Sequence, residues 1–212
     1  MDKFFASFVK VTGELGNILF FRTKRFYQDK KAQNRRIKGP AIVVSNHKSI
    51  YDFVLMMFTF FSRNLRCLVA DVLYKKKFVG FMLKKFGSIK VNRNRHDLTF
   101  VDECQRILDK GGVIEVYPEA RIPLKNENEP LPFTIGAAMI AYKSRVKIIP
   151  VYTEGRYFKF KRNYMIIGTP IDPNDIIDET LSQRENLERL NDAMRNKIIE
   201  LKDELKKRKE KR

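Results

Sequence analysis

The segment Ser45–Asp52 (SNHKSIYD) places His47, one of two histidines in this 212-residue chain, five residues before an aspartate. A neutral imidazole can take the proton of an attacking hydroxyl if a partner fixes its tautomer and stabilises the imidazolium. Asp52 can be that partner if the turn folds back, and the pair would then activate an alcohol or a thiol. Alone the pair is a weak signal, because an Asp five places after a His arises by chance about one time in nine in a chain of this composition.

The elements around this segment favour a ligand-facing position. Short β-branched runs predict strands at 41–45, 67–70, 88–91, 113–117 and 147–152, with a sixth at 164–168. Helical spacing predicts helices at 50–62, 72–86, 96–110 and 134–144. This alternation predicts an α/β single-domain sandwich with a largely parallel or mixed sheet flanked by helices. His47 then follows a strand at the carboxyl edge of the sheet, where ligands bind.

Three later segments also lie at the edges of predicted strands. Residues 86–93 read FGSIKVNR, residues 116–121 read VYPEAR and residues 148–151 read IIPV. With 46–52, they resemble in order and spacing the four motifs of the glycerolipid acyltransferases, the 1-acylglycerol-3-phosphate acyltransferase superfamily. In that family His, four residues and Asp form the catalytic dyad, and the third motif usually reads Phe-Pro-Glu-Gly-Thr-Arg. The resemblance covers roughly residues 37–170.

The resemblance implies an enzyme that moves a fatty acyl group from a thioester to a free hydroxyl of lysophosphatidate, giving phosphatidate in phospholipid synthesis. His47 would be the base and Asp52 would orient its ring. Arg93 and Arg121 would hold the acceptor phosphate, because guanidinium groups match phosphate oxygens in charge and geometry. Glu119 would bond a glycerol hydroxyl or steady one of these arginines. We expect no cofactor and no metal, with acyl-CoA or acyl carrier protein thioester as co-substrate.

The third motif departs from the family pattern. Pro-Glu-Ala-Arg at 118–121 is one residue shorter than Pro-Glu-Gly-Thr-Arg, because one alanine replaces the glycine and the threonine. The turn must therefore differ locally, and the acceptor preference is open at this point. Another lysolipid and glycerol 3-phosphate are the alternative acceptors.

Charge and the amino terminus indicate the partners. The formal charge of +18 implies a surface that attracts anions. Residues 3–27 combine phenylalanine, leucine and isoleucine with lysine and arginine, as does a helix lying in lipid headgroups. A helix packed on its own domain is the alternative. Because Lys10 interrupts the apolar run and Arg22 ends it, we expect neither a cleaved signal nor a spanning helix.

We therefore expect a peripheral or monotopic protein on the cytoplasmic face of an anionic membrane. The predicted organisation is an amphipathic membrane-association segment at 1–36, an α/β acyltransferase domain at 37–182 and a C-terminal helix with a basic tail at 183–212. The two cysteines, Cys67 and Cys104, stand far apart in apolar contexts, which indicates buried thiols and a reducing compartment.

Two other classes of function compete with the enzyme. A basic nucleic-acid-binding protein fits the charge, but the chain lacks zinc-ligand spacing, an RNA-binding strand signature and a glycine-rich phosphate loop. We therefore expect no nucleic acid partner. A lipid-binding scaffold that lost its activity is the other class. The joint presence of His47, Asp52, Glu119 and Arg121 argues against it. We assign no chemistry to His96.

Overall fold

The computed structural model describes residues 2–92, 98–127, 129–155, 157 and 162–211. Across these residues, seven strands form one sheet in the order β1-β7-β6-β2-β5-β3-β4. The strands are β1 (Thr23–Tyr27), β2 (Ala41–Ser45), β3 (Leu65–Ala70), β4 (Ile89–Val91), β5 (Val113–Val116), β6 (Ile148–Thr153) and β7 (Asn163–Ile167). Neighbouring strands run parallel except β6 and β7. The expected α/β fold with a largely parallel or mixed sheet is confirmed.

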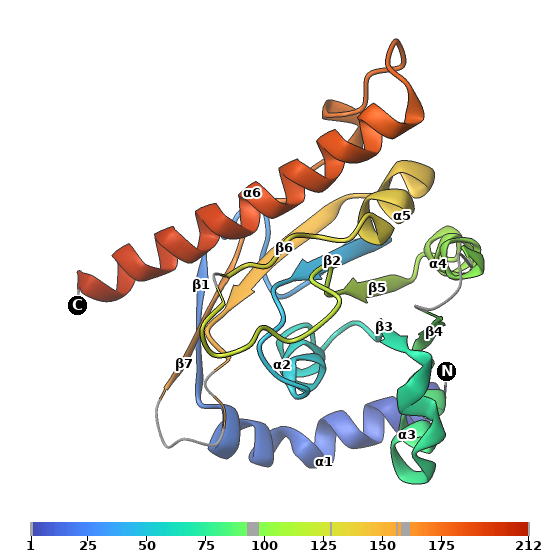
Figure 1. Ribbon diagram of the computed structural model, residues 1–212. Coiled ribbons are helices and arrows are strands. Elements are labelled where there is room, and N and C mark those ends of the chain that lie inside the picture. The colour runs from blue at the N-terminus through green and yellow to red at the C-terminus, as the bar shows by residue number, and fades with distance from the viewer. Residues whose placement is uncertain (1, 93–97, 128, 156, 158–161, 212) are drawn as a thin grey trace.

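Helices cover both faces of this sheet (Figure 1). They are α1 (Lys3–Phe21), α2 (Asp52–Thr59), α3 (Lys77–Phe86), α4 (Thr99–Asp109), α5 (Gly136–Ser144) and α6 (Gln183–Glu210), with short 3₁₀ turns η1 (Asp71–Lys75) and η2 (Pro173–Asp175). Alternate residues of each central strand enter opposite cores, as the two-residue repeat of a strand requires. Ile42 and Ile114 pack in the core that α4, α5 and α6 cover, whereas Val43 and Val113 pack with α2.

The C-terminal helix α6 packs against β6 and β7 through one buried stripe. The stripe consists of Asn186, Leu190, Met194, Ile198, Leu201 and Leu205. A capping box at Ser182 and Glu185 starts the helix, which lies where the sequence predicted one. The helix approaches the sheet closely at Gly168, where an added Cβ would lie 2.9 Å from both Leu201 and Pro150.

The amino-terminal segment holds a strand that its sequence did not predict. The helix ends at Phe21, Arg22 takes the left-handed conformation, and residues 23–27 form β1 instead of continuing the amphipathic segment. β1 pairs in parallel with β7, with Thr23 opposite Asn163. Its five residues include Thr23, Phe26 and Tyr27, which favour strands, but the charges between them hid the pattern. A second difference is that the helix expected at 72–86 is divided at Lys76, whose backbone is extended.

By length and composition, α1 also contains one candidate membrane span among the described residues. Phe4–Phe21 has a mean hydropathy of 1.3, and 22% of this window is buried in the protein. The sequence-based expectation had excluded such a span. The helix packs on α2 and α3, however, and Phe5 meets Phe86 edge to face at 5.5 Å. One face of α1 therefore packs on the domain, as one of the two sequence-based alternatives expected, and the other face is exposed.

A buried lysine fastens α1 to the domain. Lys10 is 3% exposed, and its Nζ donates to the carbonyl oxygens of Phe61 (3.0 Å) and Arg63 (2.6 Å) and to Oδ1 of Asn64 (2.9 Å). These acceptors lie just beyond α2, where a positive charge also complements the helix dipole. Burial lowers the pKa of Lys10 to about 8. The charge that interrupts the apolar run in the sequence is thus part of the packing.

We predict that Lys10→Met lowers the free energy of unfolding by about 1–3 kcal/mol, because three oxygens lose their donor. The unfolded chain holds this proton up to a pKa of 10.5, whereas the folded protein releases it at about 8. Wild-type stability therefore rises with pH through this interval, and the deficit of the variant should grow. Urea unfolding at pH values near the two pKa values, about 8 and 10.5, measures the free energy of unfolding of both proteins. Lys84→Met, at an exposed lysine, is the control. An unchanged stability, or a deficit that shrinks with pH, would contradict the assignment.

Candidate functional site

The turn after β2 folds back as the sequence predicted and joins His47 to Asp52. Asp52 is the first residue of α2 and is fully buried. Its Oδ2 lies 2.8 Å from Nδ1 of His47 and accepts the backbone N–H groups of Lys48 (2.7 Å) and Ser49 (2.9 Å). Because an ionised carboxylate can only accept, Nδ1 carries the proton and Nε2 is left as the acceptor. This is the geometry of an oriented general base.

The residue before His47 ties the turn to the neighbouring strand. Asn46 is buried, its Nδ2 donates to the carbonyl oxygen of Thr153 (2.9 Å), and its Oδ1 accepts the N–H of Thr153 (2.9 Å). The amide therefore reproduces a pair of backbone ladder bonds at the point where β2 and β6 end. Asn46 therefore braces the His47 turn against the end of β6.

Glu119 lies beside the dyad because β2 and β5 are parallel neighbours and their carboxyl ends meet. It is buried, and its two oxygens accept the N–H groups of His47 (2.9 Å) and Leu131 (2.9 Å). Burial raises the pKa of Glu119 above its usual range, although these two donors oppose that shift. Glu119 thus fixes the backbone of the turn that holds His47, and among the described residues its two oxygens accept backbone amides rather than an arginine.

A strap formed by residues 129–133 brings Leu131 to Glu119, and α6 holds this strap. Nδ2 of Asn191 donates to the carbonyl oxygen of Phe133 (3.2 Å). Nη2 of Arg195 donates to that of Pro130 (3.3 Å), and Nζ of Lys202 to that of Glu129 (2.6 Å). The C-terminal helix therefore supports the turn that holds His47 indirectly, through the strap and Glu119.

Of the two predicted phosphate-binding arginines, the structure describes Arg121, which pairs with a carboxylate other than that of Asp52. Arg121 is 52% exposed at its side chain, and its Nη1 and Nη2 form a fork with the carboxylate of Glu127 at 2.6 and 2.5 Å. Arg93 and the other histidine, His96, lie outside the described residues. Of the predicted set, the structure brings together His47, Asp52 and Glu119.

The shortened third motif forms its turn at Ala120. This residue has φ +57°, in the left-handed region that glycine takes without cost and that costs an alanine about 1–2 kcal/mol. The turn thus keeps a conformation suited to glycine, although the sequence supplies an alanine. Thr134 completes the turn by donating its N–H (2.8 Å) and its hydroxyl (2.9 Å) to the carbonyl oxygen of Pro118.

Two tyrosines that the sequence analysis did not single out contact the dyad. The ring of Tyr117 stacks on the His47 imidazole, with centroids 4.5 Å apart and planes 24° apart, and its hydroxyl donates to the buried Glu115. The hydroxyl of Tyr157 donates to Oδ1 of Asp52 at 2.6 Å. Tyr117 lies within the third motif and could have been found there. Tyr157 lies in the β6–β7 connection and carries no sequence signal.

Tyr117 also borders an apolar cavity of about 360 Å³. Leu68, Ala70, Val91, Phe100 and Met139 are among its lining residues, together with Ala120 of the shortened turn. They come from the carboxyl ends of β3, β4 and β5 and from α4 and α5. The cavity is therefore on the same edge of the sheet as His47 and begins next to the ring on which the imidazole stacks.

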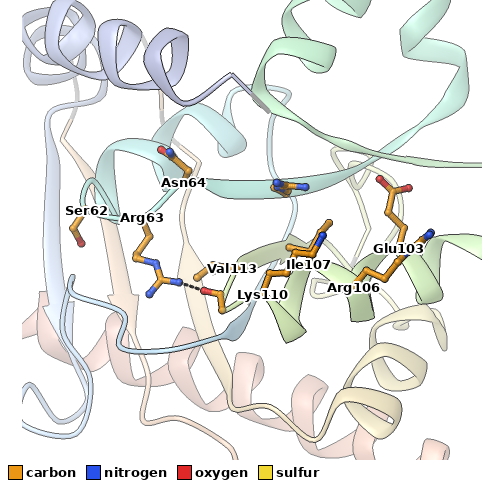
Figure 2. Close-up of a pocket in the computed structure, with 11 residues that line it drawn as sticks. Ser62, Arg63, Asn64, Glu103, Arg106, Ile107, Lys110 and Val113 are labelled. Carbon is orange, nitrogen blue, oxygen red and sulfur yellow. Dashed lines mark hydrogen bonds between the residues drawn. The ribbon is translucent and has the colours of Figure 1, made fainter.

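A different cavity, of about 640 Å³, lies at the opposite edge, where β3 and β5 begin (Figure 2). Arg63, Arg66, Arg106 and Lys110 give it a positive lining, and Arg63 donates to the carbonyl oxygen of Gly111 across it. None of the predicted site residues lines it.

In the described part of the chain, no group of three or more His, Cys, Asp or Glu side chains could hold a metal ion. Cys67 and Cys104 are buried free thiols, as expected.

We predict that Ala120→Gly leaves the free energy of unfolding equal or raises it by up to about 1 kcal/mol, because glycine adopts a positive φ without strain. Ala120→Val should lower the free energy of unfolding by about 1–2 kcal/mol relative to the wild type, since a β-branched residue is poorly accommodated at a positive φ. Chemical denaturation of the three proteins measures both effects. Equal stability of the glycine and valine variants would contradict the left-handed turn.

The sequence is similar to those of known acyltransferases. The chain is 21% identical over 169 residues to the 1-acyl-sn-glycerol-3-phosphate acyltransferase of Bacillus subtilis, which covers 77% of this chain and 82% of that protein. It is 27% identical over 136 residues to human 1-acyl-sn-glycerol-3-phosphate acyltransferase beta, which covers 61% of this chain. The match spans 48% of the human protein, about half its length.

Among solved structures, the fold is similar to that of the 1-acyl-sn-glycerophosphate (LPA) acyltransferase PlsC from Thermotoga maritima. The TM-score is 0.65 at 20% identity, with 94% of this chain and 80% of that chain covered. The family model "Acyltransferase" matches residues 25–154, which include His47, Asp52, Glu119 and Arg121. The chain therefore belongs to the acyltransferase family and is an acyltransferase enzyme of the glycerolipid type.

Proposed function

We propose that this enzyme transfers a fatty acyl group from a thioester donor to the free hydroxyl of lysophosphatidate and so produces phosphatidate. The observation that carries the proposal is the hydrogen bond between His47 and Asp52 at the carboxyl edge of the sheet, with an apolar cavity beginning at the stacked Tyr117. The names of the Bacillus subtilis and human relatives support lysophosphatidate as the acceptor.

The chemical step requires a base at one face of the acceptor hydroxyl. Nε2 of His47 takes the hydroxyl proton while the oxygen attacks the thioester carbon. The tetrahedral intermediate then collapses, the carbon–sulfur bond breaks, and the leaving thiolate takes the proton back from the imidazolium. Asp52 holds the ring and stabilises its positive charge throughout. No acyl-enzyme is formed, and the thioester comes from acyl-CoA or acyl carrier protein.

The acyl chain would lie in the apolar cavity beside Tyr117. Its lining is aliphatic and aromatic, and burial of each methylene there is worth about 0.8 kcal/mol. Met56, Met57 and Phe58 of α2, and Phe60 directly after it, are buried in the packed core.

Arg121 would bind the acceptor phosphate, with Arg93 as its partner. Arg121 follows the turn that contains Glu119, so it lies on the side of the sheet where the dyad is. In the structure, Nη1 and Nη2 of Arg121 donate to the two carboxylate oxygens of Glu127. A phosphate would accept from the guanidinium in the same two-point geometry. Acceptor binding would therefore exchange Glu127 for phosphate.

The enzyme would work at the surface of an anionic membrane, on its cytoplasmic face. The exposed face of α1 carries seven large apolar side chains, which we call the apolar platform: Phe4, Phe8, Val11, Leu15, Ile18, Leu19 and Phe20. Phe78 and Phe81 of the adjacent α3 are also exposed. Lys75, Lys76, Lys77, Lys84 and Lys85 flank these phenylalanines and suit anionic headgroups.

We predict that His47→Ala lowers the rate of thiol release by about 10²–10⁴-fold while the fold is retained, because the general base is lost. The assay supplies purified protein with acyl-CoA or acyl carrier protein thioester and screens lysophosphatidate, other lysolipids and glycerol 3-phosphate. His96→Ala is the matched control and should keep wild-type rates. Substantial residual turnover in His47→Ala would contradict the assignment of His47 as the general base. If the wild type releases no thiol with any of the acceptors, the proposed function is wrong.

A second prediction concerns the acceptor phosphate. Arg121→Ala should raise the KM for lysophosphatidate by about tenfold or more with little change in kcat, because one charge-assisted contact made in both ground and transition states is lost. Lys125→Ala removes a nearby positive charge and serves as the control. An unchanged KM in Arg121→Ala would move the phosphate site elsewhere.

A further inference from the structure

Tyr157 completes the surroundings of the catalytic aspartate. It is 5% exposed and lies in the connection between β6 and β7, 105 residues after Asp52 in the sequence. Its hydroxyl donates to Oδ1 of Asp52 at 2.6 Å, while Oδ2 accepts from His47, Lys48 and Ser49. Both oxygens of the carboxylate are therefore fixed. A carboxylate held at one oxygen can swing about its Cβ–Cγ bond, whereas one held at both cannot.

Tyr157 stays a hydrogen-bond donor at neutral pH. Burial raises its pKa far above the usual value, and the negative charge of Asp52 adds to the shift. A buried carboxylate needs such donors, because a fully desolvated charge without partners costs several kcal/mol. The hydroxyl thus both stabilises the Asp52 charge and sets the plane in which it meets the imidazole.

Phe21 in turn fixes Tyr157. It is the last residue of α1 and is 5% exposed. Its ring meets that of Tyr157 edge to face, with centroids 5.1 Å apart and an interplanar angle of 60°. The end of the helix that bears the apolar platform therefore packs directly on a residue that touches the dyad. Lys10 fixes the same helix from its other half.

We propose that Tyr157 is a positioning residue for Asp52 and that Phe21 holds Tyr157 in place, so that α1 is a part of the catalytic scaffold as well as a membrane contact. The proposal rests on the proposed function of His47 and Asp52. It predicts that damage to this contact lowers turnover even when no membrane is present. A helix that served only as an anchor would matter for membrane substrates alone.

The test uses soluble substrates, a short-chain acyl-CoA and a short-chain lysophosphatidate below its critical micelle concentration. Tyr157→Phe removes one oxygen and should lower kcat about 10–100-fold with unchanged KM, the range expected for one hydrogen bond to a charged group. Tyr164→Phe is the matched control, because Tyr164 stacks on Phe26 and packs in the core that α6 covers. Thermal melts confirm that each variant is folded.

Phe21→Leu keeps an apolar side chain but loses the edge-to-face contact, and it should lower kcat on the same substrates about three- to tenfold. Phe26→Leu is its control. If Phe21 acts through Tyr157, the double variant should be no slower than Tyr157→Phe alone. Phe8 belongs to the apolar platform. Phe8→Gln should therefore weaken sedimentation of the protein with phosphatidylglycerol vesicles, while kcat on soluble substrates stays at the wild-type value.

A spectroscopic signature separates this inference from the enzymatic proposal. In protein with ¹⁵N-labelled histidine, the Nδ1 proton of His47 bonded to Asp52 should give a downfield resonance that is absent in His47→Ala. In Tyr157→Phe it should shift and exchange faster with water, but it should be unchanged in Tyr164→Phe. An unchanged resonance and unchanged kcat in Tyr157→Phe would overturn the inference and leave the proposed function standing. A wild type without turnover would refute the function, and the resonance would still decide whether Tyr157 positions the pair.

Discussion

The site depends on one buried charge, the carboxylate of Asp52. It is removed from water, and it is stable there because four donors reach it: Nδ1 of His47, the amides of Lys48 and Ser49, and the hydroxyl of Tyr157. Three of these donors belong to the turn that the aspartate itself closes. The requirement to satisfy the charge therefore shapes the turn, fixes the imidazole tautomer and ties the β6–β7 connection to α2.

The parallel sheet makes this arrangement possible. Because β2 and β5 are adjacent and parallel, the segments that follow them meet at one edge, and Glu119 can accept the backbone amide of His47. The strap from 129 to 133 and its donors on α6 support Glu119 from behind. The buried carboxylate of Glu119 therefore fixes backbone geometry. Arg121, two residues later in the sequence, is exposed.

Helix α1 has two chemically different faces. Its buried face carries Lys10, Asn17 and Phe21, whereas its exposed face forms the apolar platform. A row of exposed apolar side chains on one helix face supports the proposed lipid interface. The strand β1 that follows pairs with β7 and locks the end of the helix to the sheet. Phe21 therefore stands between α1 and the paired strand β1, beside Tyr157.

The sequence by itself determined the α/β alternation, the buried stripe of α6 and the pair of His47 and Asp52. Each is set by residues close in the chain, whose spacing repeats the geometry of a helix, a strand or one turn. It did not determine β1, whose five residues become a strand only because β7 offers an edge. The tertiary structure alone decided that Glu119 holds the His47 backbone, that Arg121 turns to Glu127, and that Tyr157 meets Asp52. These contacts, other than the local Arg121 pair, join residues 72 and 105 positions apart, and strand order rather than local spacing brings them together.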